Sequence, residues 1–422
     1  MCAVFFPLSG GVGYSHALFW LAVNGKPMVE FLNGGVLNLS FWGYLAVTFT
    51  MVQISMMSVT LYLHRDQAHR AIGLHPALRH FFRLWVWMTS AMVTREWVAI
   101  HRKHHAMVER QGDPHSPQVF GLRKVLLEGA ELYQAEARND RTLEKYGHGT
   151  PDDWIERNVY IRLNILGVYL MLSIDIFLLG LPGITVFAVQ MLAMPVFAAG
   201  VINGLGHAKG YRNFDSDDTS TNLVPFAVLV GGEELHNNHH AYPTAAKFSA
   251  RWWEFDIGWL YICIFKFLGL CKVRRLAPMP RIAGSPRAVD VETVKAVLQN
   301  RMHVLRDYRR KVTLPVFRME KRSDRGNELL KRARKLLVTG PTLMDDAGRE
   351  RLARLLDDNA ALRTVHEFRQ QLLALWQQAN VSNERLVAQL KEWCNNAEAS
   401  GIEALHDFSA NLRGYLPQAQ PS

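Results

Sequence analysis

The sequence predicts an all-α integral membrane protein. We expect a bundle of about four transmembrane helices, a cytoplasmic helical cap that carries a histidine-rich site for two metal ions, and a soluble helical appendage at the C-terminus. Two observations predict this arrangement. Most long apolar runs lie before residue 272, whereas charge is concentrated after it. Nine of the 17 histidines fall in four places that adjoin the apolar runs.

Composition narrows the class of protein further. A chain of 422 residues has room for a membrane domain and an appendage. The net charge of +10 favours anionic surfaces such as phospholipid headgroups or a phosphate-bearing substrate. No nucleic-acid-reading motif is present, so nucleic acid is not an expected partner. The four cysteines form no C-x-x-C pair, which argues against a disulfide framework or a thiolate metal site.

Three apolar runs are long enough to cross a bilayer. Residues 41–63 carry no charge, and residues 161–181 and 184–203 are almost wholly apolar. Residues 180–183, Gly-Leu-Pro-Gly, predict a hairpin turn between the second and third runs. Residues 1–25 also lack charge, but a proline and glycines interrupt them, so a span and an interfacial segment are equally expected.

Two further apolar segments, 76–94 and 251–271, are predicted to lie along the membrane surface. The first contains Arg79, His80 and Arg83, which would be costly at membrane depth. A crossing there would also place the histidine clusters before and after it on opposite sides. Basic residues crowd the histidine side, and the positive-inside bias therefore makes that side cytoplasmic.

The domain boundary is expected near residue 275. Residues 1–275 are predicted to form the membrane domain and residues 276–422 a charged helical region of unknown role. Helical periodicity runs over 291–312, 327–337, 346–378 and 383–397. No motif in this region indicates chemistry, and its basic residues are predicted mainly to form a solvated face.

The histidines are spaced as metal ligands would be. Residues three and four apart on a helix share a face, and neutral imidazole binds iron, zinc, copper and nickel. Two clusters follow the pattern H-x-x-H-H, one follows H-x4-H, and one pairs an amide with an imidazole at i, i+4. The residues are His101, His104 and His105; His236, His239 and His240; His64 and His69; and Asn203 and His207.

Nine imidazoles exceed what one metal ion can use. A structural zinc takes three or four protein ligands and would leave most of these histidines idle. Two neighbouring ions of higher coordination number would use them all, with Asn203 holding a metal-bound water. An all-nitrogen ligand set differs from the carboxylate-rich sites of soluble di-iron bundles and suits the binding and reduction of O2. Placed at the end of an apolar bundle, such a centre is within reach of a long alkyl chain.

The flanking residues carry a family resemblance. Residues 63–70 (LHRDQAHR), 96–105 (EWVAIHRKHH), 112–117 (GDPHSP), 203–207 (NGLGH) and 232–240 (GEELHNNHH) resemble the boxes of membrane fatty acid desaturases. Within that family they are most similar to the acyl-CoA-type Δ9 branch, including its bacterial members. The resemblance covers roughly residues 37–275, and Glu234 departs from it because many members have glycine there.

The resemblance implies a fold and an activity. It implies two irons bound by the nine histidines, with Asn203 holding a water. It also implies removal of two hydrogens from a saturated acyl chain, with O2 as co-substrate, to form a cis double bond in fatty acid biosynthesis and the control of membrane fluidity. The chain would lie in a kinked tunnel, with its carrier headgroup on the cytoplasmic face of a bacterial inner membrane.

The resemblance also implies partners. The substrate would be a long-chain acyl-CoA or an acyl-lipid in contact with membrane lipids. No His-Pro-Gly-Gly segment of a fused cytochrome b5 domain is present, so electrons would come from a separate ferredoxin, rubredoxin or cytochrome b5 with its reductase.

Weaker expectations concern residues around the clusters. Asp66, Glu96, Asp113 and His115 are predicted to orient ligand imidazoles, although a structural turn explains Asp113 and His115 equally well. Arg65, Arg102 and Lys103 are candidates to bind the phosphates of a CoA carrier, although contact with lipid headgroups explains them equally well.

Two alternative functions remain. A related acyl hydroxylase or ketolase would use the same metal centre but insert oxygen into the chain. A membrane metal transporter would place its ligands near the bilayer midplane rather than at the ends of spans.

Overall fold

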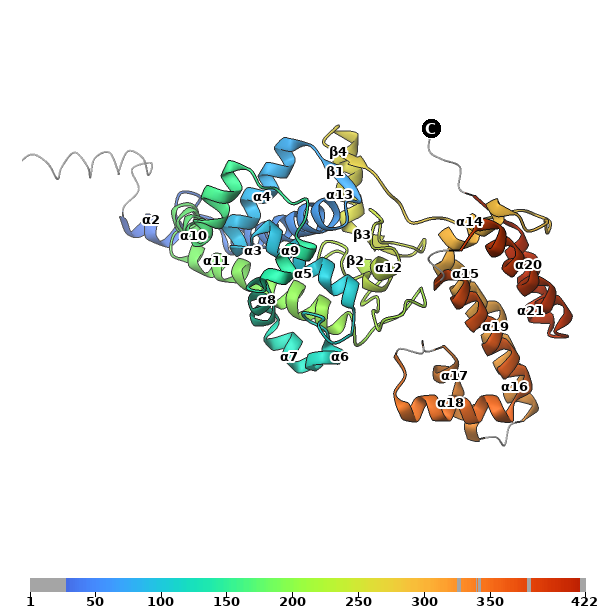
Figure 1. Ribbon diagram of the computed structural model, residues 1–422. Helices are drawn as coiled ribbons and strands as arrows, with labels where there is room; N and C mark the ends of the chain where they lie inside the picture. Colours follow the sequence, from blue (N-terminus) through green and yellow to red (C-terminus); the bar gives the residue numbers. More distant parts are fainter. Residues whose placement is uncertain (1–27, 325–327, 339, 341–342, 378–380, 418–422) are drawn as a thin grey trace, which may run out of the picture.

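The computed structural model describes residues 28–324, 328–338, 340, 343–377 and 381–417. The expectation for residues 1–25 therefore lies outside the described residues. The described chain is mostly helical, as the sequence predicts, and its three sheets each have two strands. Figure 1 shows two groups of helices, with α14 to α21 on one side of the molecule and the elements up to α13 on the other.

The first group contains the histidine clusters. Its helices, strands and π-helices are α2 (Met28–Gly34), α3 (Phe41–Ser58), η1 (Val59–Ala68), β1 (Ile72–Leu74), α4 (Pro76–Ser90), α5 (Thr94–Met107), α6 (Pro117–Phe120), α7 (Leu122–Leu127), α8 (Gly129–Ala137), α9 (Asp140–Tyr146), η2 (Glu156–Ile161), α10 (Asn164–Leu179), α11 (Pro182–Ala193), η3 (Met194–Leu205), β2 (Phe226–Ala227), α12 (His236–Ala241), β3 (Phe255–Asp256), α13 (Ile257–Phe267) and β4 (Cys271–Val273).

Two helices in the described part of the chain are long and apolar enough to cross a membrane. The first joins α3 to η1 over the 28 residues Phe41–Ala68, and the second joins α11 to η3 over the 24 residues Pro182–Leu205. Helix α10 is also apolar but has 16 residues, about 24 Å at 1.5 Å per residue. Since a bilayer core is about 30 Å thick, α10 is short for a full span. We expected about four spans, and the described residues contain two helices long enough to cross a bilayer.

The turn between α10 and α11 has the geometry that its sequence predicts. Gly180 ends α10 with a φ of 72°, and Pro182 occupies the first turn of α11. A Cβ atom on Gly180 would lie 2.5 Å from the carbonyl oxygen of Leu32, so this backbone approach requires glycine. The hairpin returns the chain toward the first histidine clusters.

The two expected surface helices are shorter than predicted. Helix α4 ends at Ser90 because Ala91 adopts a left-handed conformation with a φ of 53°. Helix α13 begins only at Ile257, where the Asp256 carboxylate caps it by accepting a hydrogen bond from the backbone amide of Trp259 at 3.0 Å. Strands β1 and β4 pair antiparallel, with Ile72 opposite Val273, and so tie the end of this group to the residues after the first histidine pair.

A π-helical turn explains the H-x4-H spacing. On an α-helix, residues five apart are rotated by about 140° and would not face one site. The π-helix η1 is wider, and the His69 amide donates to the His64 carbonyl oxygen at 3.0 Å, an i to i+5 bond. The wider turn brings both imidazoles to the same side of the helix.

The C-terminal group has its own core. Its elements are β5 (Arg281–Ile282), α14 (Val291–Gln299), α15 (Arg301–Tyr308), η4 (Arg309–Thr313), α16 (Leu314–Ser323), α17 (Glu328–Val338), α18 (Asp346–Asp358), α19 (Ala360–Gln377), α20 (Asn383–Ala399), α21 (Glu403–Arg413) and β6 (Tyr415–Leu416). One cluster of buried apolar residues runs from Val289 to Tyr415. Strand β5 pairs with β6 and joins the two ends of the group. The helical segment expected over 346–378 divides at Asn359.

Candidate metal centre

Nine histidines meet in two adjacent groups. Within each group the nitrogen atoms that could bind a metal all lie within 4.8 Å of one another. The five-histidine site consists of His64, His69, His101, His105 and His239, and the four-histidine site consists of His104, His207, His236 and His240. These are the nine histidines that the sequence singled out.

Two helices supply both sites. Helix α5 contributes His101 and His105 to the five-histidine site and His104 to the four-histidine site. Helix α12 divides its residues in the same way, with His239 in one site and His240 in the other. Because consecutive residues diverge around a helix, each H-x-x-H-H motif serves two sites at once. The rings of His105 and His240 lie 4.5 Å apart, so the sites are neighbours.

In both sites the Nε2 atoms converge. The distance between Nε2 atoms is 2.8 Å for His69 and His101 and 2.9 Å for His105 and His239. It is 3.0 Å for His207 and His236 in the four-histidine site. Such distances place the ring nitrogens around a common point in each site.

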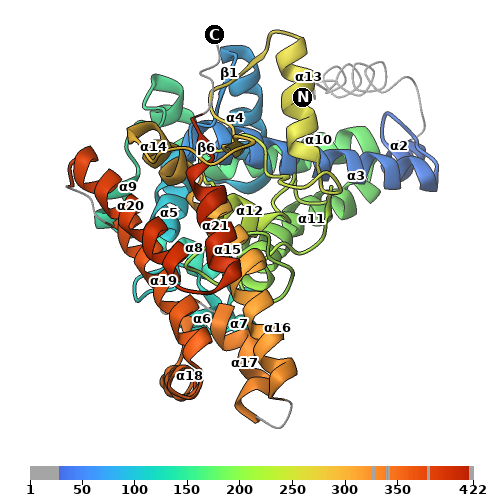
Figure 2. The same cartoon turned by 90° about the vertical axis from the view of Figure 1, so that its right-hand side faces the viewer.

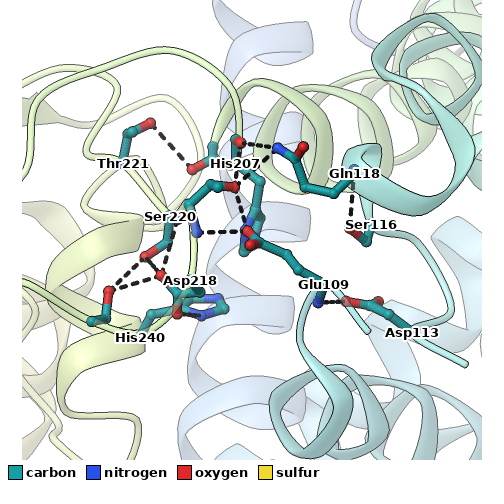
Figure 3. Close-up of polar contacts among 12 residues, drawn as sticks. Glu109, Asp113, Ser116, Gln118, His207, Asp218, Ser220, Thr221 and His240 are labelled. Atoms are coloured by element: carbon teal, nitrogen blue, oxygen red, sulfur yellow. Dashed lines mark hydrogen bonds and ion pairs between the residues drawn. The ribbon is translucent and has the colours of Figure 1, made fainter. Parts of the chain in front are cut away.

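Carboxylates hold the opposite ring nitrogens. Four of the Nδ1 atoms contact a carboxylate oxygen, at 2.7 Å in one pair and 3.0 Å in three: His64 with Glu233, His104 with Asp113, His207 with Glu109, and His240 with Asp218. Figure 3 shows Glu109 beside His207 and Asp218 beside His240. An ionised carboxylate only accepts hydrogen bonds, so each of these Nδ1 atoms carries the proton. Each Nε2 lone pair then points into its site.

This donor set fits metal cations. In His207 the proton lies on Nδ1, so its Nε2 lone pair faces the Nε2 atom of His236 at 3.0 Å. The Nε2 atoms of His104 and His240 are buried and have no hydrogen-bond partner among the described residues. Buried polar atoms without partners are costly, and a cation placed between the imidazoles would satisfy them. The arrangement therefore matches two metal ions rather than a hydrogen-bonded core.

Burial keeps these imidazoles neutral. It lowers the pKa of His69 and of His240 to about 3, from an ordinary value of 6.5. It also lowers the pKa of His101, His105 and His236 well below the ordinary range. Metal ligation requires the neutral imidazole, so at neutral pH the site has the protonation state that a metal needs.

An apolar cavity opens beside the two sites. Its volume is about 630 Å³, and His64, His101 and His236 form part of its wall. Asn203 also lines the cavity, in η3 and four residues before His207. Another part of the wall consists of residues from the apolar helices α10 and α11 with their continuation η3: Ile165, Val168, Met191, Met194 and Ala198. The cavity thus extends from the histidines to the apolar helices α10 and α11.

Residues 39–259 match the family model for fatty acid desaturases. The chain belongs to the fatty acid desaturase family. This confirms the resemblance that the histidine motifs indicated. A separate model, described as a transposase, matches residues 292–418 of the C-terminal group. Within the described part of that segment, no three His, Cys, Asp or Glu side chains are grouped so as to hold a metal ion.

Curated relatives are desaturases from plants and cyanobacteria. The chain is 29% identical over 234 residues to the Delta-9 acyl-lipid desaturase 2 of Arabidopsis thaliana, covering 54% of this chain and 74% of the relative. It is 29% identical over 271 residues to the sn-1 stearoyl-lipid 9-desaturase of Anabaena variabilis, covering 63% and 95%. It is 28% identical over 239 residues to an acyl-CoA 5-desaturase of Anemone leveillei, covering 54% and 71%.

The residues that contact the ligand imidazoles are only partly those predicted from the sequence. Asp113 contacts His104, and the ring of His115 lies 4.4 Å from the His104 ring, centroid to centroid, in a tilted arrangement. Asp66 instead binds Arg79 at 2.9 Å, and Glu96 lines the cavity. Glu109, Asp218 and Glu233 also contact ligand histidines and were not predicted from the sequence. Of these, Glu233 had a signal, because it lies three residues before the H-x-x-H-H motif at residues 236–240, which we call the third histidine box.

The three candidate headgroup residues all contact protein groups. Arg65 is fully buried, binds Asp256 at 3.0 Å and lies 3.8 Å above the ring of Phe248. Its expected headgroup role is therefore replaced by a structural one, because solvent does not reach it. Arg102 donates to four backbone carbonyl oxygens, those of Gln67, Ala68, Tyr146 and His148. Lys103 binds Glu136 at 2.7 Å.

Proposed function

We propose that this desaturase introduces a cis double bond, of Δ9 type, into a long saturated acyl chain. It would use O2 and two electrons from a separate donor protein, at two irons held by the nine histidines. The observation that carries the proposal is the apolar cavity of about 630 Å³ whose wall includes histidines of both sites. The relatives include proteins named as Delta-9 and stearoyl-lipid 9-desaturases, which supports the proposal.

The histidines would hold the irons through Nε2, with Asn203 near the four-histidine site holding a water. When bound, the two irons would supply the reduction of O2 and the oxidation of the acyl chain. The protein's own part is orientation. Asp113, Asp218, Glu109 and Glu233 fix the imidazole rings through Nδ1 and leave the Nε2 lone pairs free for metal.

The cavity would position the substrate. Trp97 stacks on His101 with ring centroids 4.9 Å apart and forms part of the cavity wall, so an acyl chain in the cavity would pass beside the metal ligands. The apolar wall excludes water from the reacting methylene groups. At the polar part of the wall lie Glu96, Tyr133, Gln134 and Arg138, which suit the carbonyl end of the acyl chain.

The proposal includes a membrane topology. Residues 1–275 would form the membrane domain, with α4 and α13 at the cytoplasmic surface of the bilayer. Helices α3 and α11 would cross it with their continuations η1 and η3, and the shorter α10 would cross where the bilayer is locally thinner. The histidine sites would face the cytoplasm, where a ferredoxin, rubredoxin or cytochrome b5 could reach them. Residues 276–422 would form a separate helical domain on that side.

The test is the fatty acid profile of cell membranes with and without the expressed chain. A variant with His104→Ala and His105→Ala, at matched protein level, is the control because it removes one ligand from each site. New cis-monounsaturated acids with the wild type alone are the expected result, and their fragmentation gives the bond position. Hydroxylated acids would move the assignment to the hydroxylase. No new product, with iron and an electron donor supplied, would contradict the enzyme.

The carrier is tested separately with purified protein in vesicles. We expect stearoyl-CoA to be desaturated directly, as the sequence motifs indicate. Two relatives are named as acting on acyl-lipid or stearoyl-lipid, so phospholipids with labelled stearoyl chains form the second arm. If only the labelled phospholipids are desaturated, the substrate is an acyl-lipid rather than an acyl-CoA.

A further inference from the structure

The loop between His207 and the third histidine box contacts the four-histidine site on one side. We call residues 212–220 the clasp loop. Oδ2 of its Asp218 lies 3.0 Å from Nδ1 of His240, and both side chains are buried. Oδ1 of Asp218 accepts a hydrogen bond from Ser216 Oγ at 2.7 Å. It also accepts one from the amide of Ser220 at 3.0 Å, and Figure 3 shows Ser220 beside Asp218. The orientation of His240 thus depends on the shape of the loop.

The clasp loop is also hydrogen-bonded to α12, the helix that carries His236, His239 and His240. Oδ1 of Asn237 accepts hydrogen bonds from the backbone amides of Asn213 and Phe214, both at 2.9 Å. Within the loop, Arg212 donates to the Ser216 carbonyl oxygen at 2.8 Å. Any displacement of residues 213–216 would therefore be transmitted to Asp218 and to α12.

The opposite side of the clasp loop contacts the C-terminal helices. Nη1 of Arg309, the first residue of η4, lies 2.7 Å from Oδ1 of Asp215. The ring of Phe214 meets His303 of α15 edge-on, with centroids 5.2 Å apart. His303 also lies 5.6 Å from the ring of Tyr242, two residues after the last histidine of the box. Figure 2 looks onto this side, with α15 in front of α12.

The contact between Arg309 and Asp215 is shielded from water. The side chain of Asp215 is 6% exposed and that of Arg309 is 21% exposed. A second cation, Arg369 of α19, is buried, and its charge acts on Asp215. Removing one partner of a shielded ion pair leaves the other charge uncompensated, so this contact is expensive to break. The π-helix η4, through Arg309, and helix α19, through Arg369, thus converge on Asp215.

We infer that the C-terminal helical domain positions a metal ligand: by binding Asp215 through Arg309, it fixes the clasp loop, and Asp218 in turn holds His240 toward the four-histidine site. Arg309 and Asp215 are positioning residues, since neither touches the site itself. The inference rests on the proposed function, because it assigns the C-terminal domain a role in iron binding. The described residues of the C-terminal domain contain no metal-binding group. The inference explains why this domain nevertheless packs against the third histidine box.

The test uses the full-length protein loaded with 57Fe. Iron per chain is measured by elemental analysis, and the two irons are distinguished by Mössbauer spectroscopy. Arg309→Ala and Asp215→Asn are the test variants. Arg309→Lys keeps the charge, and Arg310→Ala is the matched control because the neighbouring Arg310 side chain is exposed. We expect the test variants to lose about half of the iron, with one of the two Mössbauer signals reduced and the other unchanged. Arg309→Lys should restore most of it, and Arg310→Ala should equal the wild type.

The outcomes separate the two proposals. A wild type that binds no iron would overturn the proposed function and this inference with it. Two irons with unchanged Mössbauer spectra in both Arg309→Ala and Asp215→Asn would overturn the inference alone. Equal loss from both signals would also overturn it, because it indicates general unfolding rather than displacement of His240. If Arg309→Ala fails to accumulate, the nearly isosteric Asp215→Asn decides the question by the same criteria.

Discussion

Oδ1 of Asp113 lies 3.0 Å from Nδ1 of His104, and both side chains are buried. The same carboxylate accepts hydrogen bonds from the backbone amides of Glu109 and His115, at 2.7 and 3.1 Å. Burial alone would raise the pKa of Asp113, but its contact with His104 holds that pKa well below the ordinary range. Asp113 therefore stays ionised and links the orientation of a metal ligand to the backbone turn that follows α5.

We predict that Asp113→Asn weakens iron binding. The amide keeps the shape of the side chain but removes the charge that holds the proton on His104 Nδ1. Loss of such a partner lowers metal affinity by about 10- to 100-fold in other metal sites. Iron retained after dialysis against a graded chelator measures the effect. Asp152→Asn is the control, because Asp152 is 79% exposed and lies in no metal group. Equal retention in both variants would contradict the role of Asp113.

A second prediction concerns the stability of the membrane domain. Arg65 donates to Asp256 at 3.0 Å and to the Ala246 carbonyl oxygen at 2.9 Å, and both side chains of the ion pair are buried. Arg65→Ala would leave the Asp256 carboxylate buried without its cation, at a cost of about 3–5 kcal/mol in the free energy of unfolding.

Thermal unfolding in detergent measures this loss. Lys124→Ala is the matched control, because Lys124 and Glu128 are 4.0 Å apart and both about half exposed. An exposed pair of that kind contributes little. A melting temperature of Arg65→Ala equal to that of the control would contradict the structural role, and would return Arg65 to the candidates for substrate binding.

The sequence predicted the histidines but not how they divide. The i, i+3, i+4 spacing indicated one shared face for His101, His104 and His105, whereas α5 sends His104 to a different site from its neighbours. The H-x4-H spacing requires a π-helical turn, which apolar periodicity does not reveal. The helical hairpin was predictable because Gly180 and Pro182 are local signals. Local patterns therefore identified the ligands, and tertiary packing decided their grouping.

The side chains that orient the ligands were harder to predict. Glu109 and His207 are 98 residues apart in the chain, and Asp218 lies in a polar loop without a motif. Arg65 looked like a surface residue because it follows a ligand histidine and is charged, yet the structure buries it completely. Burial and long-range pairing depend on the whole fold, and a single sequence carries no direct signal of either.

The metal-free protein should lose stability in acid. Burial lowers the pKa of His69, His115 and His240 to about 3, below the ordinary 6.5 that these groups regain on unfolding. Between pH 6.5 and about 3 the unfolded chain therefore binds more protons than the folded one, and the free energy of unfolding falls as the pH falls. Above pH 6.5 these groups make no pH-dependent contribution.

Melting temperatures of the chelator-treated protein from pH 8 to pH 5 check this. We expect a plateau above about pH 7 and a steady decrease below pH 6.5. A variant with His69→Ala and His240→Ala should show a shallower decrease, because two of the buried groups are absent. A melting temperature that rises as the solution is made more acidic would contradict the assigned direction of the pKa shifts.

A fourth prediction concerns the carbonyl end of the substrate. The hydroxyl of Tyr133 is buried, lines the cavity and has no hydrogen-bond partner within the described part of the chain. Burial raises its pKa well above the ordinary value, so it remains a donor. We expect it to donate to the acyl carbonyl oxygen, an interaction of about 0.5–1.5 kcal/mol. Tyr133→Phe should therefore raise KM about 2- to 12-fold with iron content unchanged. An unchanged KM would contradict this contact.

The last prediction concerns chain length. Val168 lines the cavity. It belongs to α10, an apolar helix that contains none of the histidine motifs. Val168→Phe would fill part of the about 630 Å³ available and exclude the terminal methylene groups of a long chain. We expect the ratio of shorter to longer unsaturated products to rise relative to the wild type, with iron content unchanged. Ile184→Phe on α11 is the control, because Ile184 is 47% exposed and does not line the cavity. Chromatography of the membrane fatty acids gives the ratio, and an equal ratio in the two variants would place the end of the acyl chain elsewhere.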